Sequence, residues 1–98
     1  MATMVSNLRS PRTGNKVANQ FAIETSKGLF FQSYDTMIAH ITNDNEVHIT
    51  EWWDYSATTR KYFYQFMYEN TQYKALNAKE VRNLIKCGTF KVVRNIAV

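Results

Sequence analysis

The sequence contains a single cysteine, Cys87, and no long apolar run, and both features limit the class of protein. One thiol cannot form a disulfide within the chain or a cysteine-ligated metal cluster. Residues 1–15 lack the apolar core of a signal peptide, and no stretch approaches the roughly 18 apolar residues that span a membrane. We therefore expect a soluble protein of a reducing cytoplasm, without a cofactor, a metal or a membrane association.

Patterns typical of enzymes are also missing. No glycine-rich G-x-x-x-x-G-K loop occurs, so nothing supports nucleotide hydrolysis. Cys87 has no neighbouring base to activate it, which favours a small residue in the core or at its boundary. His40 and His48 fall on opposing segments of a predicted hairpin near Glu46 but lack a third ligand or a nucleophile, which favours exposed strand histidines. We expect no catalytic residues and no metal site.

The chain has enough apolar residues for one domain with one core. Of 98 residues, 45% are hydrophobic and 14% are aromatic, and large aromatic side chains bury considerable area in a small protein. Residues 1–16 contain the polar, turn-forming segment 10–15 and little to bury, which predicts a flexible basic arm. We expect residues 17–98 to form a single domain.

The first half of that domain has the alternating pattern of strands. Apolar residues alternate with polar ones in segments bounded by turn-forming residues. The turns 26–28 and 43–45 each connect two such segments, which predicts two hairpins. The four predicted strands are Val17–Thr25, Leu29–Tyr34, Met37–Thr42 and Glu46–Glu51. Trp52 and Trp53 follow, and we expect one ring to close the core and the other to lie nearer the surface.

The second half has the spacing of two helices. Ser56 is a good N-cap for a helix that continues to Glu69, and its predicted buried side carries Thr59, Tyr62, Phe63, Phe66 and Met67. Asn77, with Glu80 three residues later, predicts the start of a second helix that stops at Gly88. The sequence predicts an α+β fold: a four-stranded antiparallel sheet of two hairpins, then two helices packed on one face. Residues 89–93 could add a short C-terminal edge strand.

Three groups of residues carry a resemblance to a known family. They are Asn19-Gln20-Phe21, Phe31-Gln32-Ser33-Tyr34-Asp35 with Ile38-Ala39, and Trp53-Asp54-Tyr55-Ser56 with Thr58-Thr59 and Lys61-Tyr62. These motifs, within residues 10–66, resemble those of small phage and mobile-element proteins of unknown function. The resemblance implies an accessory protein of a bacterial cytoplasm and assigns no catalytic or ligand residues.

The charge is unevenly distributed along the chain. Residues 1–16 carry three bases and no acid, residues 17–58 carry one base and six acids, and residues 59–98 carry eight bases and two acids. A basic side could meet phosphate or an acidic protein surface, although opposite charges could equally pair across the fold. The start of the first helix could also hold an anion, but ordinary capping by Ser56 explains its hydroxyl residues more simply.

Basic and aromatic residues predicted on the outer helix faces form the remaining candidate site. Cations bind phosphates and tyrosines stack on unpaired bases, which favours DNA or RNA as the partner. Tyrosine and arginine are also enriched at protein interfaces, so a host protein or a second copy of the chain stays an alternative. The candidate binding residues are Arg9, Arg12, Arg60, Lys61, Tyr64, Tyr68, Lys79, Arg82 and Lys86.

Overall fold

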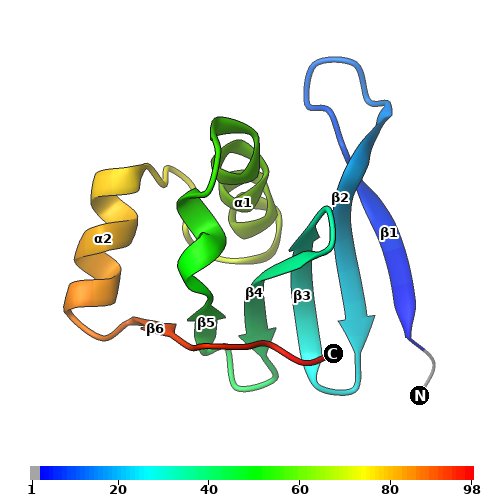
Figure 1. Ribbon diagram of the computed structural model, residues 1–98. Coiled ribbons are helices and arrows are strands. Elements are labelled where there is room, and N and C mark those ends of the chain that lie inside the picture. Colours follow the sequence, from blue (N-terminus) through cyan, green and yellow to red (C-terminus); the bar gives the residue numbers. More distant parts are fainter. Residues whose placement is uncertain (1–2) are drawn as a thin grey trace.

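A six-stranded sheet forms the frame of the protein in the computed structural model, which describes residues 3–98 (Figure 1). Its strands are β1 (Met4–Arg9), β2 (Lys16–Thr25), β3 (Gly28–Ser33), β4 (Thr36–Thr42), β5 (Val47–Ile49) and β6 (Phe90–Val92). A 3₁₀ turn, η1 (Glu51–Asp54), leads from the sheet into the helices α1 (Ala57–Asn70) and α2 (Ala78–Lys86). The predicted α+β class is confirmed, and so are both predicted helices.

The strands lie in the sheet in the order of the sequence. Strands β1 to β5 pair antiparallel with their neighbours, so the two predicted hairpins, β2–β3 and β4–β5, are both present. Strand β6 pairs parallel to β5, which makes the sheet mixed instead of purely antiparallel. The reason is the connection, because the chain passes through both helices before it returns to β5, and such a crossover allows parallel pairing.

Strand β1 corrects the prediction of a flexible arm for residues 4–16, whereas residues 1–2 of that predicted arm lie outside the described residues. Residues 4–9 pair with β2 from Met4 opposite Glu24 to Arg9 opposite Lys16, and Leu8 is buried in the core. The segment 10–15 is the loop of this hairpin, and Lys16 already belongs to β2. Short-range patterning missed β1 because the strand gains its stability from pairing with β2 and from one buried leucine.

Helix α1 lies against the sheet with the side that the sequence predicts. Its buried residues are the five expected from the helical spacing, Thr59, Tyr62, Phe63, Phe66 and Met67. Phe66 stacks on Phe31 of β3, with ring centroids 5.6 Å apart, and Val81 of α2 joins the same core cluster. Both helices therefore pack on one side of the sheet, as predicted.

The other side of the sheet is covered more thinly. Phe30 points away from Phe31, as strand alternation requires, yet it is also fully buried. The His40 ring stacks on it, with centroids 4.1 Å apart. In Figure 1 the segment after β6 crosses in front of the sheet and ends near β3. No helix within residues 3–98 is long and apolar enough to cross a membrane.

Candidate functional site

Three hydroxyl side chains form a hydrogen-bonded chain where α1 meets β3. Ser56 is the N-cap of α1, and its Oγ accepts a hydrogen bond from the Thr59 N–H at 3.1 Å. The Ser56 hydroxyl donates to Thr59 Oγ1 at 3.1 Å, and this atom lies 3.2 Å from Ser33 Oγ. The predicted N-cap is confirmed, and these hydroxyls bond to one another in the way that ordinary capping implies.

A pocket of about 540 Å³ opens beside this hydroxyl chain, between the β3–β4 turn and the connection from η1 to α1. Its volume lies within the range of about 300–1,000 Å³ that is typical of small-ligand sites. Besides the three hydroxyl residues, its lining includes Tyr34, Asp35, Ile38, Trp52, Tyr55 and Thr58. The pocket therefore combines an apolar floor, large aromatic side chains and a few polar groups.

The aromatic side chains of the pocket are held in solvent. Tyr34 is 56% exposed, Trp52 44% and Tyr55 75%, although side chains of this size are usually more buried. Trp52 and Tyr55 meet edge to face, with ring centroids 6.1 Å apart and planes at 70°. Trp53 is buried in the core, so the expectation of one core and one surface tryptophan is confirmed. Three exposed aromatic rings therefore lie around one cavity, and exposed apolar surface of this kind is typical of interaction sites.

Tyr34 occupies an unfavourable backbone conformation. Its φ of 57° lies in the left-handed region, which bulky side chains rarely adopt. The Tyr34 N–H donates to the Asn19 carbonyl at 2.6 Å, and the Tyr34 carbonyl accepts from the Gln32 side-chain amide at 2.6 Å. These two hydrogen bonds hold the turn, and the strained backbone carries the phenol to the pocket. Strain of this kind costs about 1–3 kcal/mol and clusters at functional sites.

A buried amide lies opposite the same hydroxyl chain. Gln20 is fully buried and is the register partner of Ser33 in the β2–β3 pair. Within residues 3–98, its Nε2 and Oε1 atoms have no hydrogen-bond partner. Buried polar groups are normally satisfied, so an unsatisfied amide is a second unfavourable feature beside the strained turn.

The second candidate region is a group of cations contributed by the β1–β2 hairpin and by α1. Gln65 Nε2 donates to the Arg9 carbonyl at 2.6 Å and so joins the hairpin to a helix 56 residues away in the sequence. Lys61 lies one helical turn before Gln65, on the same side of α1. We call this group the basic ridge: Arg9, Arg12, Lys16, Arg60 and Lys61.

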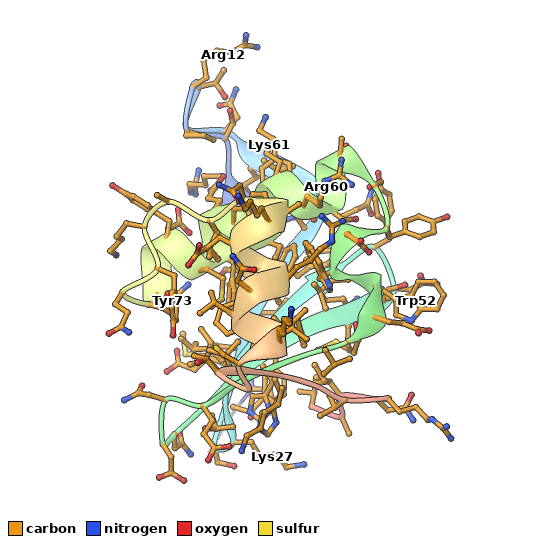
Figure 2. The ribbon with its side chains drawn as sticks, turned by 90° about the vertical axis from the view of Figure 1, so that its left-hand side faces the viewer. Arg12, Lys27, Trp52, Arg60, Lys61 and Tyr73 are labelled. Atoms are coloured by element: carbon orange, nitrogen blue, oxygen red, sulfur yellow. The ribbon has the colours of Figure 1, made fainter. Side chains whose placement is uncertain are left out.

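The ridge cations are not neutralised by ion pairs. Figure 2 shows Arg12, Lys61 and Arg60 gathered at one end of the molecule, with Lys27 at the opposite end. Within residues 3–98, none of the five ridge side chains has a carboxylate within 4 Å. Glu69 adjoins the ridge through a hydrogen bond from Gln65 at 3.2 Å. The Arg9 and Arg60 guanidinium groups donate to backbone carbonyls, so the ridge keeps its positive charge without an ion pair among residues 3–98.

Of the three predicted site residues of α2, Arg82 approaches the ridge at Asp54, whose carbonyl oxygen accepts a hydrogen bond from the Arg60 guanidinium at 3.2 Å. Arg82 lies 3.7 Å from an Asp54 carboxylate oxygen and stacks over the Trp53 ring at 5.7 Å. Lys79 and Lys86 are exposed at the start and at the end of the helix. The charge of Arg82 is therefore paired with a partly exposed carboxylate, and the two lysines are separated along α2.

The two predicted tyrosines of α1 are also separated. Tyr64 packs against the core, and its buried hydroxyl has no hydrogen-bond partner within residues 3–98. Burial raises the pKa of Tyr64 against the opposing effect of Arg60. Tyr68 is 55% exposed, and the Lys74 ammonium lies 4.9 Å from its ring centroid. The predicted exposed pair of tyrosines is therefore not formed.

The remaining polar residues of the predictions are the two histidines and the cysteine. His40 and His48 are directly opposite in the β4–β5 pair, as predicted, with ring centroids 5.9 Å apart. Within residues 3–98, no group of three or more potential ligands could hold a metal ion. Cys87 is exposed, so the expectation of a core or boundary position is wrong. Its hydrogen bond with the Thr89 hydroxyl lowers the pKa of the thiol.

Residues 4–83 match a family of unknown function, DUF8033. The chain belongs to this family. No curated protein and no solved structure matches the chain. The family match spans the pocket and all five residues of the ridge, and it assigns neither an activity nor a phage origin.

Sequence reasoning missed the pocket, although its signal was present. Tyr34, Asp35 and Ser33 belong to one quoted motif, whereas Tyr55 and Ser56 belong to another. Along its own segment each motif indicates only a strand or a helix cap, and the contact between β3 and α1 brings the two together. Two polar and aromatic motifs that flank a predicted hairpin would have been the pattern to combine.

Proposed function

We propose that this protein binds single-stranded DNA or RNA, with the basic ridge against the phosphates. The observation that carries the proposal is the ridge itself, five cations from two distant segments without a carboxylate within 4 Å among residues 3–98. Each phosphate that a cation neutralises releases condensed counterions, and this release favours binding. The binding is largely independent of sequence, because backbone contacts carry no base information.

A protein partner is the less supported alternative. That alternative required the exposed pair Tyr64 and Tyr68, but the Tyr64 hydroxyl is buried and Tyr68 lies beside Lys74. A desolvated protein groove gains little from one tyrosine at the end of a helix. A group of cations without acid partners fits a phosphate backbone better.

A salt titration tests the proposal. Fluorescence anisotropy of labelled 12-nucleotide single strands of DNA and RNA, at several salt concentrations, gives the slope of log affinity against log salt. We expect a slope of roughly −0.7 for each phosphate contact, with a steep fall in affinity between 50 and 200 mM salt. Absence of binding to any single strand at low salt would contradict the proposal and favour a protein partner.

Matched charge removals locate the contact. The double variant Arg60→Ala, Lys61→Ala should reduce the steepness of the slope by the contribution of about one to two phosphate contacts. Lys27→Ala removes a positive charge at the opposite end of the molecule and should leave the slope unchanged (Figure 2). If both variants flattened the slope equally, the binding would come from the net positive charge of the protein and not from the ridge.

A further inference from the structure

We propose that the pocket between the β3–β4 turn and the start of α1 binds a nucleobase, stacked on the exposed rings of Trp52, Tyr55 and Tyr34. The proposal rests on the proposed function. The ridge contacts the phosphates of the strand, and the pocket contacts one of its bases. The ligand class is a planar heteroaromatic ring with an exocyclic amine, supplied either by a single strand or by a free nucleotide.

The aromatic rings of the pocket are exposed and leave flat surface available for stacking. Trp52 and Tyr55 meet edge to face, so their planes do not cover each other and ring surface stays open. Stacking of a base on an aromatic side chain tolerates any base, because every base has a flat π-surface. The pocket thus provides a platform that the core does not use.

The strained turn is an independent observation for the same site. Tyr34 keeps its unfavourable φ of 57° although its side chain is exposed and contributes little burial. Glycine would fit this backbone without strain. A tyrosine at this position therefore costs backbone strain that glycine would avoid, and it presents a phenol to the pocket.

Asp35 provides the pocket with a hydrogen-bond acceptor for the edge of the bound base. Asp35 is a lining residue of the cavity and is exposed, and within residues 3–98 its carboxylate forms no ion pair. A carboxylate accepts hydrogen bonds and repels phosphate, so it favours the edge of a base with an exocyclic amine over a phosphate group. Adenine, cytosine and guanine carry such an amine, whereas thymine and uracil do not.

The pocket and the ridge meet at the first turn of α1. Thr58 and Thr59 line the cavity, and Arg60 follows them directly as the first cation of the ridge. In Figure 2 Arg60 lies between Lys61 and the side of the molecule that carries Trp52. A strand whose phosphates follow the ridge would therefore bring a base to the pocket.

An abasic strand separates the two contacts. A 12-nucleotide oligomer of deoxycytidine and an abasic oligomer of the same length carry similar phosphates, so their affinity ratio measures the bases alone. We expect wild-type protein to bind the base-bearing oligomer roughly 5- to 150-fold more tightly, the range for one stacked base. If the two oligomers bound with equal affinity and the same salt slope, the pocket would not bind a base. The proposed binding of nucleic acid by the ridge would still stand.

Alanine variants test whether the pocket is the source of the affinity ratio between the base-bearing and the abasic oligomer. Trp52→Ala and Tyr55→Ala, at exposed positions that should not unfold the chain, should each lower the ratio at least fivefold. Tyr68→Ala removes an exposed ring that lies about ten residues, or roughly 15 Å, along α1 from the pocket residue Thr58, and should leave the ratio unchanged. Far-ultraviolet circular dichroism checks that each variant is folded, and equal losses in all three would overturn the proposal.

Asp35→Asn tests recognition of the ring edge. Wild-type protein should prefer oligodeoxycytidine to oligothymidine, and the variant should lose this preference while it keeps its salt slope. The two oligomers have the same backbone, so the ridge contributes equally to both affinities. A preference that is absent in wild type, or that survives in the variant, would overturn the role of Asp35 as the recognition group.

Free ligands distinguish the source of the ring. Cytidine monophosphate should quench the emission of Trp52, a signal obtained by subtracting the emission of Trp52→Ala, which retains Trp53. If cytidine monophosphate quenched this emission but no oligomer bound, the ligand of the pocket would be a free nucleotide. The proposed function of binding single strands would then be contradicted. Quenching by neutral sugars and not by the nucleotide would overturn the base as the ligand class.

Discussion

Tyr34 illustrates, at the scale of a single residue, how a site can cost stability. A tyrosine at φ 57° is held by two hydrogen bonds that involve its own backbone N–H and carbonyl groups, and both bonds survive any change of its side chain. The phenol therefore depends on the turn, whereas the turn does not depend on the phenol. This asymmetry predicts the effect of replacing it.

Tyr34→Gly should raise the free energy of unfolding by about 1 kcal/mol, because glycine removes the left-handed strain, offset in part by its greater freedom in the unfolded chain. Urea denaturation followed by circular dichroism measures the change. Tyr55→Gly is the matched control, since Tyr55 has an ordinary φ of −55° and glycine there should lower stability by roughly 0.5–1 kcal/mol. A marked loss of stability in Tyr34→Gly would mean that the phenol supports the fold.

Single residues also explain why some predictions held. The buried side of α1 follows from the helical repeat alone, because residues three and four apart lie on one side of any helix. Tyr64 shows the limit of that argument. Its spacing places it on the outer side of α1, but the neighbouring core covers its hydroxyl, and the repeat of one helix contains no information about its neighbours.

At the scale of elements, β1 is the main departure from expectation. The segment Met4–Arg9 is held by pairing with β2, by the Gln65 contact with the Arg9 carbonyl, and by burial of Leu8. Each of these interactions joins residues distant in the sequence, so the local pattern of residues 1–16 could not indicate them.

Leu8→Ala should lower the free energy of unfolding by about 2–5 kcal/mol, because a buried leucine loses its apolar contacts and leaves a cavity. Chemical denaturation measures the loss. Val5→Ala on the same strand is the control, since Val5 is exposed and the change should stay within about 0.5 kcal/mol. A similarly small effect of Leu8→Ala would restore the flexible arm.

The parallel pair β5–β6 makes a pH-dependent contribution. Lys91 Nζ donates to Glu46 Oε1 at 3.1 Å, and this hydrogen bond, followed by that of His48, lowers the pKa of Glu46 below its ordinary value of 4.5. A lowered pKa in the folded state means that the stabilisation is present above pH 4.5. It is lost as the pH falls through the lowered value.

Lys91→Met should therefore make stability less dependent on pH below 4.5. We expect wild-type protein to lose more stability than the variant as the pH falls through this window, by a modest amount because the pair is exposed. Chemical denaturation at a series of pH values measures the difference. Lys27→Met removes a charge without an ion pair among residues 3–98 and should retain the wild-type pH dependence.

At the scale of the whole molecule, the fold redistributes the charges of the sequence. The base-rich first 16 and last 40 residues were expected to act together, but their cations separate into different environments. Arg9, Arg12 and Lys16 meet α1 at the ridge, whereas Arg82 pairs with Asp54 and Lys91 pairs with Glu46. The salt slope and the base-to-abasic ratio described above test the two parts of the surface that remain available.

The sequence by itself determined the local features of this protein: the two helices and their caps, five of the six strands with β6 as the short C-terminal edge strand, the core side of α1 and a single apolar core. These features depend on residues a few positions apart, whose spacing sets which side chains share a side. The tertiary structure alone decided the pairing of β1, the parallel direction of β6, the basic ridge and the aromatic pocket. Each of these joins segments that only the folded chain brings together, so no local pattern could predict them.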